Sequence, residues 1–550
     1  MEPKKLAQLL FPNVEKTIEE YEDVYPPRPL AADAKVTRLG PSPTGFIHLG
    51  NLYGAFVDER LAHQSGGTMI LRIEDTDAKR AVEGAVETVI NRLDYFGIQF
   101  DEGATLEGEK GAYGPYHQQQ RVALYHAAAK RLVELGKAYP SWASEEELAD
   151  IRARQEAAKV MPGYYGQWAQ DRYLSDDDIM ANLEAKKPFV LRLKASGKSS
   201  LTENFIDGIR GSITVHPNDQ DAVLLKADGV PTYHFAHVVD DHYMRITHII
   251  RGEEWLSTLP IHLELFEAFG WQPPIFCHTA HLMKIDEGVR RKLSKRLDPE
   301  LSLEYYMEVG YFPQAVREYL MILMNSDFEE WRIENPDLPL EDFPFTLDKM
   351  SVSGALFDME KLDYVSKEVL LKIPEQEIME FLIQWSKNYK PEVTDKLVTH
   401  QEALIGLFSI GRTDRQPRKD LLNATQILDF VSYYFDDQFS YMDDLPERVD
   451  RQEAVTILNE FLNSFDLTVD GAEWFNNVKA IAEKLGYAVK MKDYRKNPDN
   501  YKGSVADVAT VIRLAMVGTR QSTDLYSIQK VFGVQKTTER LHQYIKELTP

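Results

Sequence analysis

The sequence predicts an α/β domain followed by an all-α region, because two patterns succeed each other along the chain. In the front half, short apolar runs suited to buried strands alternate with turn-forming loops and helical stretches. After about residue 345, apolar residues recur at three- and four-residue spacing, which is typical of the buried face of a helix. A chain of 550 residues is long enough to supply separate cores for both parts.

The first elements predict a strand–helix–strand unit. Residues 1–34 are acidic and end in a proline-rich stretch, so we expect an N-terminal extension attached to the main domain. The run 36–39 predicts a strand, the apolar spacing from Leu49 to Phe56 predicts a helix after a turn-rich loop, and 68–73 predicts a second strand. This order is that of the βαβ unit, from which parallel sheets are built.

The middle of the chain predicts an insertion into this domain. Between about 110 and 220 the pattern is irregular, and strand-like runs return at 222–225 and 246–250. We therefore expect an α/β domain over 35–345 with an inserted subdomain over about 110–220, followed by a helical region over 346–550. Two of its helices are expected to bury the faces that carry Val455, Leu458 and Leu462, and Trp474, Val478 and Ile481.

Composition excludes several classes of protein. Hydrophobic residues make up 43% and charged residues 27%, which is globular rather than disordered composition. The mean hydropathy of −0.38 and the lack of a long apolar run argue against a membrane protein, and residues 1–30 have no apolar leader character. Cys277 is the only cysteine, so disulfides and a cysteine-rich zinc site are excluded and a cytoplasmic protein is expected.

The charge pattern is acidic overall with local basic segments. With 63 basic and 87 acidic residues the net charge is −24, which argues against nonspecific coating of nucleic acid. Binding responds to local patches, however, so a specific nucleic-acid partner is compatible with this charge. The two basic segments are Arg290, Arg291, Lys292, Lys295 and Arg296, and Arg412, Arg415, Arg418 and Lys419.

Two motifs suggest a nucleotide site. The loop at 38–51 ends in His-Leu-Gly-Asn where the predicted helix begins, and the free N–H groups of a helix N-terminus are a natural seat for phosphate. The segment 292–296, Lys-Leu-Ser-Lys-Arg, carries two lysines that can clamp a polyphosphate. The alternatives are a capped helix with a surface histidine and a solvated basic run. The presence of both motifs in one α/β domain favours nucleotide binding.

Together with their surroundings, these motifs resemble the glutamyl-tRNA synthetases, which are class I aminoacyl-tRNA synthetases. The wording of the proline-rich loop is similar to the glutamyl rather than the glutaminyl branch. The resemblance covers residues 35 to 550 and is strongest in the front half. The matching segments are PSPTG at 41–45, LRIEDTD at 71–77, TYHFAHVVDD at 232–241, THIIRGEEW at 247–255 and KLSKR at 292–296.

The resemblance implies a Rossmann-like catalytic domain with a connective, acceptor-binding insertion, followed by an all-α anticodon-binding region. It implies ligation of L-glutamate to tRNA(Glu) through glutamyl-adenylate, with ATP consumed, AMP and pyrophosphate released, and bound tRNA required for adenylate formation. Mg²⁺ is expected to accompany ATP, and the chain is expected to be monomeric. Some relatives carry zinc in the insertion, but Cys277 lies beyond that insertion, so we expect no zinc and no other protein-bound metal.

The resemblance also assigns residues to roles. Arg38 and Arg251 suit a dicarboxylate substrate and Glu74 suits its ammonium group, although an internal ion pair is the alternative. His237 departs from the asparagine of some relatives. The assigned ATP site is His48, Gly50, Asn51, Lys292, Ser294 and Lys295, of which His48, Lys292 and Lys295 are the catalytic residues. The assigned glutamate site is Arg38, Ser42, Glu74, Tyr233, His237, Arg251 and Trp255.

For the anticodon, the resemblance points to the segment that contains Arg412, Arg415 and Arg418, with Arg418 near the third base. A solvated loop is the alternative. Three other functions stay open: an enzyme that also charges tRNA(Gln), a truncated paralogue that glutamylates a tRNA base, and a tRNA-binding paralogue without activity. The long helical region argues against the second, and the intact motifs argue against the third.

Overall fold

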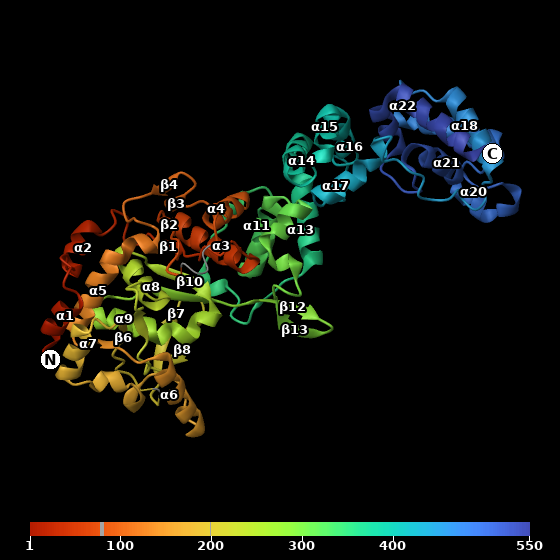
Figure 1. Cartoon of the computed structure of the whole chain (residues 1–550). Coiled ribbons are helices and arrows are strands. Elements are labelled where there is room, and N and C mark those ends of the chain that lie inside the picture. Colours follow the sequence, from red (N-terminus) through yellow and green to blue (C-terminus); the bar gives the residue numbers. More distant parts are fainter. Residues whose placement is uncertain (78–81, 199, 550) are drawn as a thin grey trace. The chain divides into compact units, whose positions relative to one another are not determined.

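The computed structural model describes residues 1–77, 82–198 and 200–549. The chain divides into two compact units (Figure 1). Unit 1 comprises Met1–Tyr305 and Arg317–Asp358, and unit 2 comprises Tyr306–Val316 and Met359–Pro550. The α/β part and the all-α part predicted from the sequence are both present. The change between them falls at Met359 rather than at 346, because residues 317–358 pack with unit 1.

The centre of unit 1 is a set of parallel strands. β1 (Val36–Leu39), β2 (Thr68–Leu71) and β3 (Glu102–Thr105) are parallel neighbours, and β4 (Gly108–Lys110) is antiparallel to β3. β10 (His248–Gly252) and β11 (Ile275–Thr279) form a second parallel pair, which joins β1 where the Thr247 amide donates to Val36 at 2.9 Å. The predicted strand–helix–strand unit is confirmed, with α3 (Leu49–Gln64) between β1 and β2.

Helices cover these strands (Figure 1). α5 (Val122–Glu134), α8 (Tyr233–Tyr243) and α9 (Leu259–Phe269) share one apolar core with β1, β10 and β11. α3 packs against β1, β2 and β10, and α4 (Ala85–Tyr95) follows β2. The loops at the carboxyl ends of β1 and β10 lead into the segments that carry the predicted site residues, as is usual for an open parallel sheet.

The N-terminal segment belongs to this core rather than hanging from it. Ala7 and Leu10 on α1 (Pro3–Leu10) and Ile18 on α2 (Ile18–Val24) are buried against the main domain. Arg28 pairs with Glu102 at 2.7 Å and donates to the Met244 carbonyl oxygen at 3.0 Å. The expectation of an attached extension therefore needs correction: its acidic composition concealed the apolar residues that face inward.

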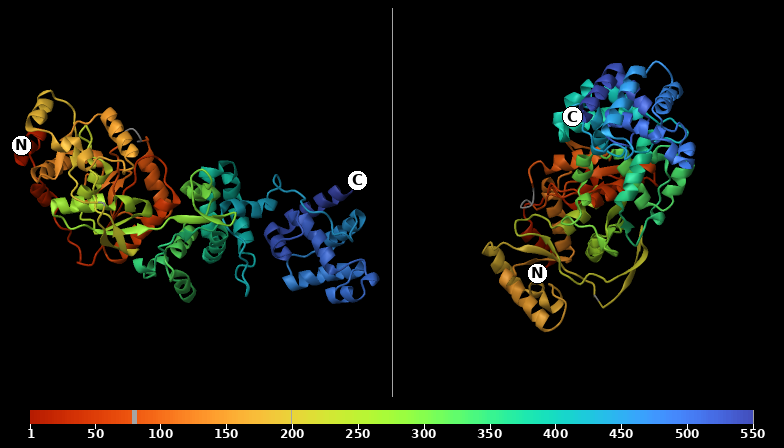
Figure 2. Two further views of the ribbon diagram at one scale, coloured as in Figure 1. Left: turned by 90° about the horizontal axis from the view of Figure 1, so that it is seen from below. Right: turned by 90° about the vertical axis from the view of Figure 1, so that its right-hand side faces the viewer.

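The insertion has its own sheet. β5 (Ala138–Ser141), β6 (Val190–Leu193) and β9 (Val223–Leu225) are antiparallel, and β7 (Glu203–Asp207) and β8 (Gly211–Val215) form a hairpin. α6 (Glu145–Ala157) lies at the periphery of unit 1 in every view (Figure 2), and α7 (Asp176–Glu184) follows it. The helix α5, which lies within the predicted insertion, shares one apolar core with β1, β10 and β11, and residues of β5, β6 and β9 pack into the same core. The run at 222–225 is a strand of the insertion, not of the parallel set.

The rest of unit 1 follows β11. β12 (Leu282–Asp286) and β13 (Val289–Lys292) form a hairpin that β14 (Ala355–Leu356) extends. Further elements along the chain are η5 (Glu253–Thr258), η6 (Pro299–Leu301), α10 (Leu303–Val309), α11 (Pro313–Met324) and α12 (Phe328–Glu334). The segment Tyr306–Val316, which spans the end of α10 and the start of α11, belongs to unit 2. Among the described residues, no helix combines the length and the apolar character that crossing a bilayer requires.

Unit 2 is helical, as predicted. Trp474, Val478 and Ile481 are buried as expected. On α18, Leu458 is buried as predicted and Val455 and Leu462 are partly buried, while the centre of the buried face also includes the residues Ala454, Ile457 and Phe461. The helices are α13 (Met359–Lys372), α14 (Glu375–Tyr389), α15 (Pro391–Thr399), α16 (Gln401–Ser409), α17 (Ala424–Val431), α18 (Arg451–Ser464), α19 (Gly471–Lys484), α20 (Met491–Lys496), α21 (Val505–Val517) and α22 (Leu525–Leu548).

Candidate active site

His48 caps the N-terminus of α3. Its Nδ1 accepts from the Asn51 amide at 3.2 Å, and the Asn51 Oδ1 accepts from the His48 amide at 3.1 Å. Because Nδ1 is an acceptor, the proton of the neutral ring lies on Nε2, which can donate to a phosphate oxygen. A side chain at Gly50 would approach the His48 ring to 3.0 Å, so glycine leaves room for the imidazole there. The Asn51 side chain is therefore part of the cap of α3.

The second motif follows β13 and comes close to the first. Lys295 Nζ lies 3.4 Å from the centre of the Phe46 ring, and the Phe46 and His48 rings are 5.9 Å apart. Lys292 Nζ lies 3.3 Å from His281 Nε2. Burial and the charges of Lys295 and Lys292 lower the pKa of His48 to about 4, so its ring is neutral near pH 7. The tertiary fold has therefore brought together the two motifs that the sequence separates.

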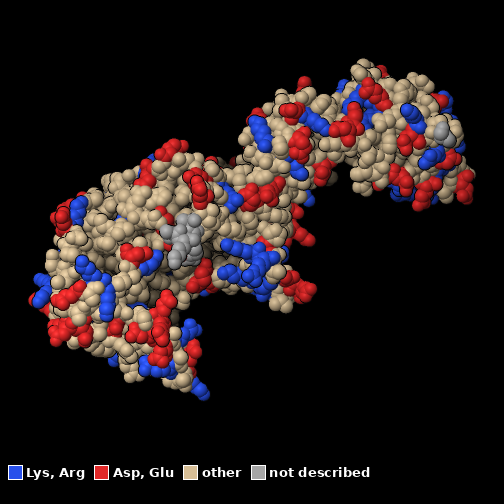
Figure 3. Space-filling view, viewed as in Figure 1, with Lys and Arg blue, Asp and Glu red and all other residues tan. Residues whose placement is uncertain are grey.

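The lysine loop is held by ion pairs on its other side. Asp298 accepts from Arg291 at 2.6 Å and from the Ser294 amide at 2.8 Å. The side chains of Lys292 and Lys295 stay exposed. In the space-filling view, basic side chains gather beside the β12–β13 hairpin (Figure 3). This cluster stands out on an acidic protein and offers mobile positive charge next to a helix N-terminus.

A buried charge network lies beneath the loop that follows β1. Asp241 on α8 accepts from Arg38 at 3.2 Å and from Arg72 at 2.6 Å, and Arg72 also pairs with Glu74 at 3.0 Å. Although burial opposes it, the two guanidinium groups hold the pKa of Asp241 below its ordinary value. Sequence reasoning assigned Arg38 and Glu74 but missed their partners. The ion pair raised as an alternative does exist, and it holds both residues in place.

Gly40 explains how Glu74 approaches this loop. A Cβ at Gly40 would lie 2.4 Å from Glu74 Oε1, so any other residue would displace the carboxylate. Ser42, further along the same loop, is exposed, and its backbone oxygen accepts from the Thr44 amide at 2.8 Å.

Aromatic rings form one wall of the site. Tyr233 and His237 lie one turn apart on α8 with their rings stacked at 5.5 Å, and the Trp255 ring is 4.7 Å from Tyr233. His237 Nδ1 lies 3.2 Å from Arg38 Nη2. Burial and the nearby guanidinium groups of Arg38 and Arg251 hold the pKa of His237 well below its usual range, so this ring is neutral.

Arg251, on β10, is 8% exposed and is held by imidazoles. Its Nε donates to His278 at 2.9 Å and its Nη1 donates to His262 at 2.9 Å. Its Nη2 is buried and has no hydrogen-bond partner in the part of the chain that the structure describes. Burial lowers the pKa of Arg251 to about 10, which leaves the group charged near neutrality. A buried guanidinium with a donor to spare, beside Tyr233, suits an anionic ligand group.

In unit 2, the three arginines predicted to read the anticodon differ from one another in burial and in their contacts. Arg412 is buried and donates to the Leu370 and Ile373 carbonyl oxygens at 2.8 and 2.7 Å, so its guanidinium caps the end of α13. Arg418 lies 4.7 Å from the Phe430 ring and pairs with Asp420. Arg415 is exposed.

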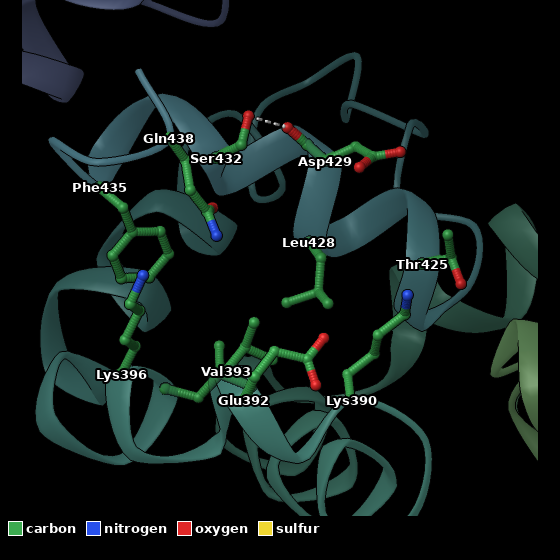
Figure 4. Close-up of a pocket in the computed structure, with 11 residues that line it drawn as sticks. Lys390, Glu392, Val393, Lys396, Thr425, Leu428, Asp429, Ser432, Phe435 and Gln438 are labelled. Carbon is green, nitrogen blue, oxygen red and sulfur yellow. Dashed lines mark hydrogen bonds between the residues drawn. The ribbon is translucent and has the colours of Figure 1, made fainter.

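A separate cavity of about 330 Å³ lies between α15 and α17 in unit 2. Its lining is mixed, with Leu428 among the apolar residues, and Lys390 and Lys396 lie on opposite sides of it (Figure 4). Lys396 is already ion-paired with Asp437. Within the described ranges, no group of three or more His, Cys, Asp or Glu side chains is arranged to hold a metal ion.

Comparisons with known proteins identify the family of the chain. The model of the catalytic domain of class I tRNA synthetases (E and Q) matches residues 35–364. The glutamate–tRNA ligase of Acetivibrio thermocellus is 58% identical over 546 residues, covering 99% of this chain and 100% of that protein. That of Clostridium perfringens strain SM101 is 44% identical, with 99% and 100% covered. The crystal structure of a glutamate tRNA ligase from Elizabethkingia meningosepticum in complex with its amino acid has a TM-score of 0.74 at 28% identity, covering 94% of this chain and 100% of that one.

Proposed function

The chain belongs to the class I tRNA synthetases of the glutamate and glutamine branch, and from this premise we propose that it ligates L-glutamate to tRNA(Glu) with ATP. The observation that carries the choice of amino acid is Arg251, a buried guanidinium held by two imidazoles with Nη2 unsatisfied. A carboxylate supplies the charge and the acceptor that this site lacks, whereas an amide supplies only the acceptor.

In this proposal the amino acid lies between Arg251 and the loop after β1. Arg251 and the Tyr233 hydroxyl receive the side-chain carboxylate, and Trp255 borders the aliphatic part. Glu74 receives the α-ammonium group, and Ser42 and His237 border the backbone end of the substrate. Arg38, anchored by Asp241, adds positive potential where the second carboxylate lies.

Adenylate formation follows from the meeting of the two motifs. An oxygen of the α-carboxylate attacks the α-phosphorus of ATP, the new P–O bond forms, and the bond to the β-phosphate breaks to release pyrophosphate. His48 Nε2–H and the α3 N-terminus at Gly50 hold phosphate oxygens, while Asn51 acts through the cap that orients the His48 ring. The loop with Lys292, Ser294 and Lys295 stabilises the leaving charge. Mg²⁺ bound together with ATP would neutralise part of the phosphate charge.

In the second step the 2′-hydroxyl of the terminal ribose of tRNA attacks the activated carbonyl carbon, and AMP leaves. By resemblance, the first step requires bound tRNA. Unit 2 is assigned to the anticodon, with Arg415 and Arg418 as the remaining candidate contacts, since Arg412 is used within the protein. We place the enzyme in the cytoplasm as a monomer.

An aminoacylation assay tests the proposal. Purified chain, ATP and Mg²⁺ are combined with radiolabelled glutamate or glutamine and with tRNA(Glu) or tRNA(Gln). We expect glutamate to be transferred to tRNA(Glu) and glutamine to be transferred to neither tRNA. Glutamate transfer to tRNA(Gln) at a comparable rate identifies a non-discriminating enzyme, and glutamine as the preferred amino acid contradicts the proposal.

A further inference from the structure

We propose that Asp207, His278, His262 and His234 form a hydrogen-bonded relay that positions Arg251 and leaves its Nη2 free for the substrate carboxylate. These four are positioning residues, and none of them was singled out for the site by sequence reasoning. The inference rests on the proposed function, in which Arg251 binds the side chain of glutamate. The relay explains why Arg251 would select glutamate over glutamine.

One arm of the relay runs across the parallel strands. Arg251 on β10 and His278 on β11 are register partners, and the Arg251 Nε donates to His278 Nε2 at 2.9 Å. His278 Nδ1 lies 2.6 Å from Asp207 Oδ2, and both residues are buried. Asp207 is itself held, because its Oδ1 accepts from the Ile209 and Arg210 amides at 2.9 Å each. The end of β7 in the insertion thus orients a ring in the main domain.

The other arm joins two helices. The Arg251 Nη1 lies 2.9 Å from His262 Nδ1 on α9, and His262 Nε2 lies 3.0 Å from His234 Nδ1 on α8. His262 has no exposed surface. The two arms approach different edges of the guanidinium plane, so together they set both its position and its rotation.

The position of every proton in the relay follows from the guanidinium, which can only donate. His278 must accept at Nε2, so its proton lies on Nδ1 and is donated to Asp207. His262 must accept at Nδ1, so its proton lies on Nε2 and is donated to His234. Both rings are therefore neutral, and burial, reinforced by the charge of Arg251, holds the pKa of each below its usual range.

Because its two acceptors are neutral imidazoles, Arg251 keeps its positive charge available for a ligand. A carboxylate paired with Arg251 would cancel its charge and compete with the substrate, whereas imidazoles hold the group and leave its charge in place. The Nη2, buried without a partner among the described residues, is the donor that a ligand satisfies. Glutamine would leave this buried charge unpaired, so the relay favours glutamate over glutamine.

The sharpest test is Asp207→Asn, because it exchanges one oxygen for an NH₂ group and keeps the shape. With Asn Oδ1 still accepting the two backbone amides, its Nδ2 faces His278 Nδ1 and forces the proton to Nε2, opposite the Arg251 N–H. We expect the KM for glutamate to rise about 10–100-fold, as for a misplaced binding group, while the KM for ATP changes less than twofold. The glutamate-over-glutamine ratio should fall.

Matched controls separate this effect from loss of folding. Asp221 is equally buried and pairs with Arg172 within the insertion, so Asp221→Asn should leave the KM for glutamate unchanged. In a double-mutant cycle, Asp207→Asn should add nothing further in a His278→Leu background. Unchanged glutamate KM in Asp207→Asn, or full additivity in the cycle, would overturn the relay.

The second arm gives an independent test that holds even where Asp207→Asn fails to fold. His262→Leu removes the acceptor, whereas His262→Gln keeps one, so the KM for glutamate should rise more than tenfold in the first and at most threefold in the second. Equal effects of the two variants would contradict the inference. Arg251→Leu separates the two proposals: if glutamate use survives it, the proposed pocket is wrong, and if only Arg251→Leu is damaging, the pocket stands and the relay fails.

Discussion

The two units place their charged residues differently. In unit 1, Arg72, Asp240 and Asp241 have no exposed surface and are linked to one another, and this network reaches Arg38 and Glu74. In unit 2, the core around Trp474 and Phe461 is apolar, and two of the four cations in the candidate anticodon segment, Arg415 and Lys419, are exposed. A buried charge must be paired, so its partners restrict where it can lie, while an exposed cation is solvated by water and needs no partner in the protein.

This difference explains why the roles of Arg38 and Glu74 in unit 1 could be assigned from short sequence motifs, whereas the arginines of unit 2 could not be assigned in this way. Where charges are buried, changing one residue should disturb chemistry through its partners. Where they are exposed, most changes should be silent unless the residue contacts the tRNA directly. The following experiments examine that contrast.

The largest effect is expected for Arg251→Leu in unit 1. Truncation removes the charge that receives the substrate carboxylate and should cost about 2–5 kcal/mol of transition-state binding for glutamate. Steady-state kinetics at saturating ATP and tRNA measure this loss as the fall in kcat/KM for glutamate. Arg38→Leu should fall in the same range, because Asp241 loses a partner; a loss below threefold for both variants means that the pocket is elsewhere.

Lys295→Ala should follow, although this cation is exposed. It lies beside Phe46 at the entrance of α3, where the leaving pyrophosphate develops charge, so kcat should fall about 10²–10³-fold with little change in the KM for glutamate. ATP–pyrophosphate exchange in the presence of tRNA measures this step. The neighbouring exposed cation gives the control, since Arg296→Ala should stay within a few-fold of the wild type; an unaltered kcat in Lys295→Ala would refute the assignment.

Arg412→Ala should act on stability rather than on recognition. Its guanidinium donates to carbonyl oxygens at the end of α13, so we expect the free energy of unfolding, measured in urea, to fall by about 1–3 kcal/mol. The ratio of tRNA(Glu) to tRNA(Gln) charging should not change. A changed ratio at unchanged stability would return Arg412 to the anticodon contacts.

His48 provides a test by pH. Its pKa is about 4 in the folded chain and about 6.5 when unfolded, so only the unfolded state takes up the proton between these values. Stability should therefore fall as the pH drops from 6.5 toward 4, by roughly 1–2 kcal/mol at pH 5. Urea unfolding of the wild type and of His48→Gln at pH 7.5 and 5 measures it, and the two proteins should lose the same stability if the histidine plays no part.

The smallest effect is expected for the exposed cation Arg415 and its neighbour Arg418. If either reads a base of the anticodon, its change to Gln should narrow the preference for tRNA(Glu) by about 1–3 kcal/mol while adenylate chemistry survives. If the arginine contacts only phosphate, the variant should bind both tRNAs more weakly by the same factor, and the slope of log K against log[salt] should fall by about one unit. Charging that is identical to the wild type in both variants would place the anticodon elsewhere on unit 2.

Much of the catalytic part could be predicted because its signals are local. The strand at 36–39, the loop and the helix from Leu49 are consecutive in the chain, and the preference of each segment agrees with the fold. His48 and Gly50 are placed by the start of that same helix. Helical periodicity likewise predicted unit 2 and the burial of Leu458 on α18, but it missed Ile457 and Phe461, since neighbouring helices decide which side is covered most deeply.

The sequence by itself determined the order of elements, the helix N-terminus that can hold phosphate, the lysine loop and the family. The tertiary structure alone decided which charges meet. Asp207 and His278 are 71 positions apart in the sequence. Arg251 on β10 contacts the His278 ring on β11 and the His262 ring on α9. Buried polar groups are satisfied by whatever the fold brings within hydrogen-bond distance, and a linear sequence does not contain that distance.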